Sequence, residues 1–292
     1  MRKMYLMALA VCLMTACEKM EIPSSTDATA TTEPTTATKK FTFTLKGNFS
    51  DEWKTRGYLQ ADGKDLTDVW VLDYKDGTLV QQIHQDDNTA EDFGQPVMNL
   101  SYGAHHIYFI ASRGTTPALN TENHIISFSK VLDTFYKDYE VSVVATSNGN
   151  RAVTLDRVVT RLRLTFSDAM AEDAATINVT PTTWYYGWDY INGTPATAAP
   201  SQATIINIPS SEIGKTGVFA SLYGFSSSTE WTTNVSINVK TSTNAVLGSV
   251  TLTDTPFKAN RSSNFEGPLF SSGGALAMTL SAAWDDAFEG TW

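Results

Sequence analysis

The sequence predicts an all-β protein made of two consecutive β-sandwich domains. Its segments of regular hydrophobic alternation are short, and they repeat with a period of two residues, as strands do. Clusters of Gly, Asn, Asp and Ser separate these segments at close and regular spacing, which is typical of sandwiches. Hydrophobic residues make up 42% of the chain, enough for substantial cores. The 292 residues allow two domains of ordinary size or one large β domain.

Residues 1–16 have the pattern of an export signal, which is excluded from the fold. Arg2 and Lys3 form a basic start, residues 4–13 are apolar, and small residues precede Cys17. The apolar run is too short to span a membrane. The pattern resembles a bacterial lipoprotein signal, in which the chain is cut before Cys17 and that cysteine is acylated.

Cys17 is the residue on which two interpretations differ. In the first, it carries lipid such as palmitate and attaches the chain to a membrane. In the second, an ordinary secretory signal is cut after Ala16 and Cys17 has no role. Cys12 lies in the removed part, so the mature chain has no second cysteine for a disulfide or a metal site.

Residues 17–39 are expected to form a disordered linker that carries the lipid. Residues 23–38 are almost wholly Thr, Ala, Ser and Pro, a composition that cannot bury a core. A coil of this length reaches roughly 25 Å and would hold the folded part away from a membrane surface. The formal charge of −10 and the lack of a basic stripe argue against a nucleic-acid partner. No later segment is long and apolar enough to span a membrane, so lipid is the expected membrane contact.

The first domain is expected over residues 40–150 and opens with the strand that contains Phe41, Phe43 and Leu45. These three residues alternate with polar ones and therefore share one face. The next two strands form a hairpin around a glycine turn at residues 75–77. Further strands of this domain are expected at 69–74, 78–83, 97–100, 104–111 and 140–146, and the segments 125–128 and 131–139 are expected to include one short helix or loop. The strand at 104–111 is apolar on both faces, which indicates a central position.

The second domain is expected over residues 151–292, after the turn cluster Ser-Asn-Gly-Asn at 147–150. Its first segment, residues 152–166, alternates strongly. Further strands are expected at 176–179, 203–208, 217–223, 234–240 and 245–252.

The chain ends in a strand candidate that follows a Ser-Ser-Gly-Gly hinge at residues 271–274. Leu276, Met278, Leu280 and Trp284 all stand at even positions and so share one face of an extended chain. A strand on such a hinge can close its own domain or reach the sheet of another molecule.

The sequence gives no signal for an enzyme, a cofactor or a metal site. The nucleophile elbow, the phosphate-binding loop and the paired-histidine zinc motif are all missing. His105 and His106 are neighbours at the start of a strand, so they point to opposite faces and cannot readily chelate one ion. Asp86 and Asp87 lack the glycine and the alternating carboxylates of a calcium loop.

Aromatic residues are densest at residues 184–190. Trp184, Tyr186 and Trp188 could form an exposed platform on which sugar rings stack. The alternative, which we favour, is that these rings fill a sandwich core and a subunit interface, because aromatic side chains dominate both.

Arg161 and Arg163 lie on one strand candidate and share the face opposite Leu162 and Leu164. This face is expected to be solvated and paired with acids. Contact with an acidic neighbour is the alternative.

The order of features resembles the fimbrial subunits of Bacteroidales, the group that contains fimbrillins and minor or anchor subunits. The resemblance covers most of the mature chain. It rests on the signal at Cys17, the Thr-rich linker, Phe-Thr-Phe-Thr-Leu at 41–45, Thr55-Arg56, and the segments 68–74, 99–108, 158–164, 258–261 and 265–267.

The resemblance implies two transthyretin-like or immunoglobulin-like β-sandwich domains and assembly by strand exchange. In that family, stalk and tip precursors are trimmed at an arginine, which removes the first strand, and the C-terminal strand of another subunit takes its place. Here the cut would fall between Arg56 and Gly57, and the donated strand would be the one from Ala275 to Trp284. Anchor subunits keep their first strand and their lipid.

The resulting hypothesis is a non-enzymatic structural subunit of a surface fimbria, or pilus, that is itself exported as a lipid-anchored protein of the outer membrane. Its partners would be other fimbrial subunits, together with a host or glycan ligand in an adhesive role. A surface glycan-binding lipoprotein that uses Trp184, Tyr186 and Trp188 is the first alternative. A secreted hydrolase without a recognisable site is the second.

Overall fold

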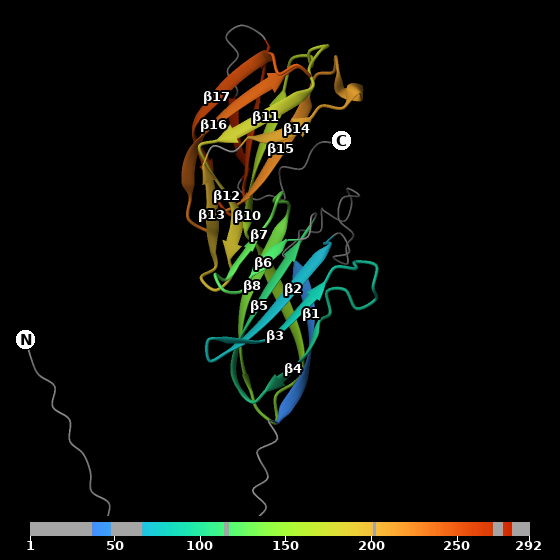
Figure 1. Cartoon of the computed structure of the whole chain (residues 1–292), viewed down its shortest axis with the longest axis vertical. Coiled ribbons are helices and arrows are strands. Elements are labelled where there is room, and N and C mark those ends of the chain that lie inside the picture. The colour runs from blue at the N-terminus through green and yellow to red at the C-terminus, as the bar shows by residue number, and fades with distance from the viewer. Residues whose placement is uncertain (1–36, 48–65, 114–116, 201–202, 271–276, 282–292) are drawn as a thin grey trace, which may run out of the picture. The chain divides into compact units, whose positions relative to one another are not determined.

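The computed structural model describes residues 37–47, 66–113, 117–200, 203–270 and 277–281, and it describes side chains for these except 197–200 and 277–281. The described elements are nineteen strands and one 3-10 turn, η2 (Ser210–Glu212), which confirms the all-β prediction (Figure 1). No helix in these ranges is both long and apolar enough to cross a membrane. The predicted signal peptide, Cys17, most of the linker, Arg56 and Gly57 lie outside the described residues.

The first sandwich consists of one seven-stranded sheet that turns back on itself. Its strand order is β3-β2-β5-β8-β9-β1-β4. Strands β8 and β9 pair only at Phe135 with Arg157 and at Tyr136 with Asp156, so the sheet folds over at this place. The strands are β1 (Thr38–Gly47), β2 (Asp68–Lys75), β3 (Thr78–Gln85), β4 (Val97–Ser101), β5 (Gly103–Ser112), β8 (Thr134–Val143) and β9 (Asn150–Arg157).

Strand β5 shows why two-sided hydrophobicity marks a central strand. It lies between β2 and β8. Ile107 and Phe109 face the core of the first sandwich, whereas Tyr108 and Ile110 pack in a second cluster on the other face. The predicted hairpin between β2 and β3 is also confirmed, and the positive φ angles at Asp76 (50°) and Gly77 (74°) are those that a tight hairpin turn requires.

The second sandwich has two four-stranded sheets, ordered β15-β10-β18-β19 and β14-β11-β16-β17. Apolar side chains from both sheets form one core, which includes Leu162, Val179, Leu222 and Ile237. The strands are β10 (Val159–Phe166), β11 (Thr176–Pro181), β14 (Thr204–Asn207), β15 (Val218–Phe225), β16 (Trp231–Lys240), β17 (Val246–Phe257), β18 (Ser262–Gly267) and β19 (Ala277–Ser281).

A third sheet joins the two halves of the chain. It contains β6 (Ala118–Asn120), β7 (Ile125–Ser127), β12 (Thr183–Asp189) and β13 (Thr194–Pro200), in the order β13-β12-β7-β6. A hairpin of the first half thus pairs with a hairpin of the second half. Beside it, the hydroxyls of Tyr74 and Tyr190 lie 2.9 Å apart, and the hydroxyl of Tyr136 donates to the carbonyl of Tyr190 at 2.8 Å.

The boundary between the sandwiches lies near Val158, close to the expected position near residue 150. Strand β9 pairs with β1 and β8 and so belongs to the first sandwich. The second sandwich begins with β10, after Val158. The continuous alternation over 152–166 concealed this change of sheet, because strands of both sandwiches share the same two-residue period.

The buried tyrosines predict a loss of stability at alkaline pH. Burial raises the pKa of Tyr108 to about 12 and also raises the pKa values of Tyr136 and Tyr190. The unfolded chain has tyrosine pKa values of about 10, so this stabilisation is complete below pH about 10 and is lost as the pH rises toward the folded-state values. Tyrosinate absorbance and circular dichroism, followed together, should show late-ionising tyrosines whose titration coincides with unfolding. Ionisation of all tyrosines near pH 10 in a fully folded chain would contradict the expectation.

Candidate functional site

The first strand, β1, occupies an inner position although it stands at the N-terminal end of the fold. It pairs in parallel with β9 on one side and antiparallel with β4 on the other. Its amides donate to three carbonyls that lie outside the regular ladders: Thr42 N to Gly149 O at 2.7 Å, Phe43 N to Pro96 O at 3.0 Å and Leu45 N to Gly94 O at 2.9 Å. Removal of β1 would therefore leave unpaired backbone groups on two strands.

The side chains of β1 fill the centre of the first core. Phe41 and Phe43 are both 0% exposed, and Leu45 is partly buried against the same cluster. The Phe43 ring meets Phe109 edge-on at 5.1 Å, and the Arg151 guanidinium lies 5.4 Å from the centre of the Phe41 ring. The predicted apolar face of this strand is thus the face that contacts the core.

The free energy that β1 contributes to folding is large compared with the total stability of a domain. Burial of Phe41 and Phe43 contributes about 1.5–3 kcal/mol each. Each ladder hydrogen bond adds about 1 kcal/mol, whereas a whole domain is stable by about 5–15 kcal/mol. A first sandwich without β1 would have an apolar trough between two free strand edges, which is the type of site that binds an added strand.

Gly149 allows β1 to approach the turn before β9. A Cβ atom at this position would lie 2.3 Å from the carbonyl oxygen of Lys40, inside contact distance. The neighbouring backbone bond from Thr42 to Gly149 depends on the same close approach.

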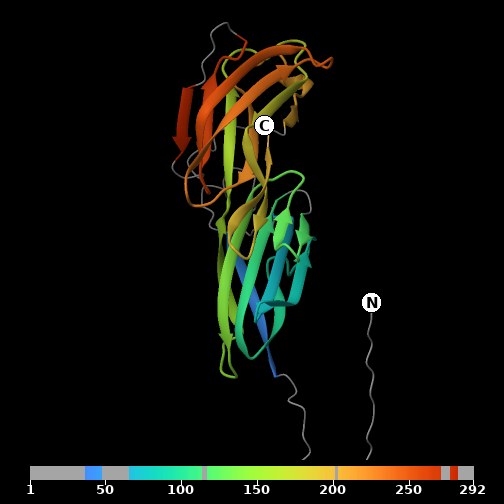
Figure 2. The same cartoon turned by 60° about the vertical axis from the view of Figure 1, so that its left-hand side comes forward.

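The candidate donor strand lies at the edge of the second sandwich. Strand β19 pairs antiparallel with β18, with Met278 opposite Phe265 and Leu280 opposite Ser263 (Figure 2). Leu276 and Trp284 lie outside the described residues. In this arrangement the tail adds a fourth strand to its own sheet, one of the two outcomes that the sequence allowed.

The predicted aromatic platform does not exist as a surface. Trp184 is 1% exposed, its Nε1 donates to the carbonyl of Tyr223 at 2.9 Å, and its ring meets Phe257 edge-on at 5.0 Å. Trp188 is 3% exposed and belongs to the cluster between the two halves. Two of the three proposed sugar-stacking rings are therefore buried, as the core alternative predicted. Tyr186 is partly buried and lines a pocket.

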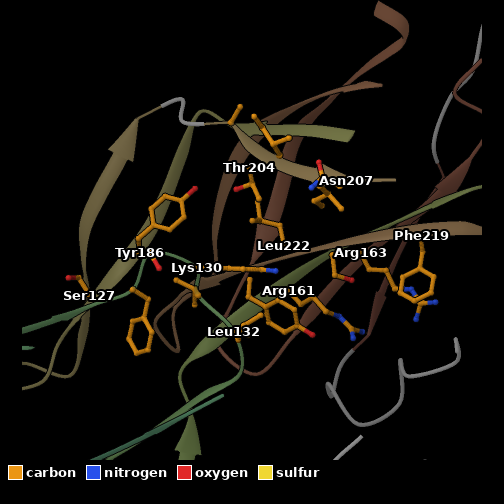
Figure 3. Close-up of a pocket in the computed structure, with 18 residues that line it drawn as sticks. Ser127, Lys130, Leu132, Arg161, Arg163, Tyr186, Thr204, Asn207, Phe219 and Leu222 are labelled. Atoms are coloured by element: carbon orange, nitrogen blue, oxygen red, sulfur yellow. The ribbon is translucent and has the colours of Figure 1, made fainter. Parts of the chain in front are cut away.

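This pocket has a volume of about 1090 Å³ and is rich in positive charge. Figure 3 shows Lys130, from the segment between β7 and β8, near Arg161 and Arg163 of β10. Tyr186 of β12 and Phe219 of β15 add aromatic side chains to the lining. None of the described residues that line the pocket carries a carboxylate. We refer to these five residues and the space between them as the basic pocket.

The two arginines of the basic pocket are held in different ways. Arg161 is 1% exposed, and its Nε donates to the hydroxyl of Ser262 at 2.8 Å. Burial lowers the pKa of Arg161, but a guanidinium keeps its proton in proteins. The Arg163 guanidinium lies 4.4 Å from the centre of the Phe219 ring, a cation–π contact. The two side chains share the face that the sequence predicted, but that face lines a pocket rather than open solvent.

Arg157 differs from these two because a carboxylate neutralises it. Its Nε and Nη2 donate to the two oxygens of Asp133 at 2.7 and 3.1 Å, and its Nη1 donates to Asn260 at 2.9 Å. Through these bonds the Arg157 guanidinium links the residue before β8 to the loop before β18. The charges of Arg157 and Asp133 neutralise each other.

The two adjacent histidines face opposite ways, as predicted. His105 is buried, and its Nδ1 lies 2.7 Å from the carboxylate of Asp73. His106 is exposed on the other face, with Asp138 and Glu140 of β8 close enough for all three to contact one cation. Sequence spacing could not reveal this group, because its carboxylates come from the neighbouring strand.

Comparison with known proteins supports the fold alone. No family model matches the chain, and no curated protein matches its sequence. The solved structure of a candidate adhesin of Bacteroides thetaiotaomicron is similar, with a TM-score of 0.51 and 7% identity over 82% of this chain and 96% of that one. A candidate cell adhesion protein of Bacteroides uniformis gives a TM-score of 0.50 and 11% identity over 85% of this chain and 99% of that one.

Replacement of Gly149 by alanine tests how tightly β1 is held. The added methyl group would collide with the Lys40 carbonyl, so β1 should loosen while β2 and β5 keep their places. Hydrogen exchange should accelerate at residues 41–45 by at least about tenfold, which corresponds to about 1.4 kcal/mol. Thr44→Ala, at an exposed position of the same strand, is the control and should change the stability by less than about 0.5 kcal/mol. Equal exchange rates in G149A and the native chain would show that the turn does not hold β1.

Proposed function

We propose that the chain is a structural, non-enzymatic subunit of a bacterial surface fimbria that assembles by exchange of β1 for a strand of another subunit. The observation that carries the proposal is the position of β1, which is first in the chain yet inner in the sheet. Because β1 precedes the other strands of its sheet, a single cut after it would separate it from them. Because it lies between β4 and β9, its departure would leave an open place between these two strands. The likeness in fold to two adhesion-related proteins of Bacteroides supports the same assignment.

Arg56 is the proposed cleavage site. Residues 48–67 connect β1 to β2, and Arg56 lies within this connection. A cut between Arg56 and Gly57 would leave β1 attached only to the N-terminal linker and to lipidated Cys17. An uncut chain would keep β1 and its lipid and serve as an anchor at the outer membrane.

The tail is the proposed replacement strand. A strand that takes the place of β1 needs apolar side chains two residues apart, to occupy the spaces left by Phe41 and Phe43. Leu276, Met278 and Leu280 have that spacing. The tail also stands at a sheet edge, so it can leave β18 without the loss of an inner strand.

The aromatic run cannot serve as a platform for sugar rings, because Trp184 and Trp188 are buried. A host ligand of an adhesive subunit would bind elsewhere on the surface.

Treatment with an arginine-specific protease tests the role of Arg56. Digestion of the full chain should give a new N-terminus at Gly57, release residues 17–56 and yield oligomers that resist mild detergent, because the freed trough accepts a strand. The variant Arg56→Ala should stay monomeric under the same treatment. Assembly of R56A, or complete cleavage at Arg56 with only monomers as product, would contradict strand exchange at this site.

Deletion of residues 275–292 tests the role of the tail. The chain should fold as a monomer, because the described side chains of both cores all precede the deletion. After cleavage it should accept a strand from an intact subunit but donate none, so it should end growing polymers when mixed with native protein. Size-exclusion chromatography with light scattering measures both effects. An unfolded deletion variant would instead show that the tail is needed to close its own domain.

A further inference from the structure

We propose that His106, Asp138 and Glu140 form a binding site for a divalent transition-metal ion such as Zn²⁺. Each of the three side chains offers one ligand atom, and these atoms all lie within 4.8 Å of one another. We refer to the three residues as the β5–β8 site, after the two strands that carry them. The site goes beyond the proposed function and does not depend on strand exchange.

Strand pairing places the three side chains together on one face of the sheet. His106 of β5 lies directly opposite Glu140 of β8, and Asp138 lies opposite Tyr108, two residues further along β5. Residues two apart on a strand point to the same side, and residues directly opposite each other on paired strands share that side. The site is thus built on two neighbouring strands, which hold its backbone more precisely than a loop would.

The side chains are close to the spacing that a bound ion needs. The Nδ1 atom of His106 lies 3.6 Å from an oxygen of Asp138 and 3.9 Å from an oxygen of Glu140. Zn²⁺ binds nitrogen and oxygen ligands at about 2.0–2.2 Å, so two ligands of a tetrahedral ion are about 3.4 Å apart. The two distances from His106 exceed that spacing by about 0.5 Å or less, which a small rotation of an exposed side chain removes.

The site is open to solvent but its imidazole is oriented. The side chains of His106, Asp138 and Glu140 are 49%, 40% and 76% exposed, so an ion can enter without a rearrangement of the fold. The His106 ring stacks on Tyr108, with the ring centres 6.4 Å apart and the planes inclined by 21°. Three protein ligands leave the fourth position of a tetrahedral ion to water.

Charge favours a divalent cation at this place. With neutral imidazole, the two carboxylates give the site two negative charges, on a chain whose formal charge is already −10. Among the residues that the structure describes, His106 is the ion-pair partner of both carboxylates, and even a protonated imidazole would leave one negative charge uncompensated. A divalent ion would neutralise both charges and relieve the repulsion between Asp138 and Glu140.

The ligand set selects the type of metal. Imidazole nitrogen suits Zn²⁺ and its neighbours among the first-row transition metals. Mg²⁺ and Ca²⁺ instead prefer sites made of oxygen atoms alone. The presence of His106 beside the two carboxylates therefore favours Zn²⁺ over Ca²⁺.

A bound ion would join the outer part of β8 to β5. Strand β8 pairs with β9 only at Phe135 and Tyr136, whereas its pairing with β5 continues to Val143. From Lys137 onward, β5 is therefore the neighbour that the described strands provide for β8. The ion would add a second link between these strands, on the face of β5 opposite the core that contains Ile107.

Isothermal titration calorimetry of the uncut chain with zinc chloride tests the site. The chain should bind Zn²⁺ saturably, and His106→Gln, Asp138→Asn and Glu140→Gln should each weaken the binding of one equivalent by at least about tenfold, because the loss of a group that merely supports a ligand already costs about 10–100-fold. Asp156→Asn removes the same charge from the carboxylate that pairs with Lys137 and is the matched control, which should keep the native affinity. Ca²⁺ at equal concentration should not displace Zn²⁺.

Hydrogen exchange shows whether the ion lies between β5 and β8. At free Zn²⁺ ten times the dissociation constant, exchange of amides at residues 137–141 through openings that separate the two strands should slow by about elevenfold. His106→Gln should abolish this effect.

Three outcomes would overturn the proposal. The first is equal Zn²⁺ affinity in H106Q and the native chain. The second is Zn²⁺ binding that leaves the exchange of β8 unchanged. The third is displacement of Zn²⁺ by an equal concentration of Ca²⁺. All of these measurements use the uncut chain, so their failure is distinguishable from a failure of polymerisation after cleavage at Arg56.

Discussion

The insertion of β1 between β4 and β9 is the interaction on which the first sandwich depends. It supplies backbone partners to two strands and two fully buried phenylalanine rings to one core. Among the described strands of this sandwich, β1 comes first in the chain. It is joined to the rest of the sandwich only through the segment between β1 and β2, residues 48–67. The core of this sandwich and the backbone pairing of two strands therefore depend on an inner strand that comes early in the chain.

The second sandwich has no comparable gap, and its free element is the tail. Strand β19 is at an edge and follows β18 through residues 268–276, so it can pair or leave without exposing both faces of a core. The two sandwiches thus differ: the first holds an inner strand that comes early in the chain, and the second carries a late strand at a sheet edge. The third sheet and the tyrosines around Tyr190 join them.

The buried and partly buried arginines of the two sandwiches have different surroundings. Arg157 is neutralised within the fold by Asp133 and so serves structure. Arg161 and Arg163, on the next strand, face a pocket whose described lining has no acid. The Nε of Arg161 donates to the Ser262 hydroxyl, and the Arg163 guanidinium lies over the Phe219 ring, so both side chains also contribute to the packing of the second sandwich.

The sequence by itself determined the local features. Alternation predicted which face of β1 is apolar, the Asp76-Gly77 turn predicted the first hairpin, and adjacency predicted that His105 and His106 point apart. These follow from the two-residue period and from backbone geometry, which depend on neighbours in the chain. Tertiary structure alone decided that β9 belongs to the first sandwich, that Trp184 and Trp188 are buried, and that Lys130 lines the same pocket as Arg161. Each of these outcomes depends on contacts between residues far apart in sequence, and a local pattern carries no information about which distant strand will cover it.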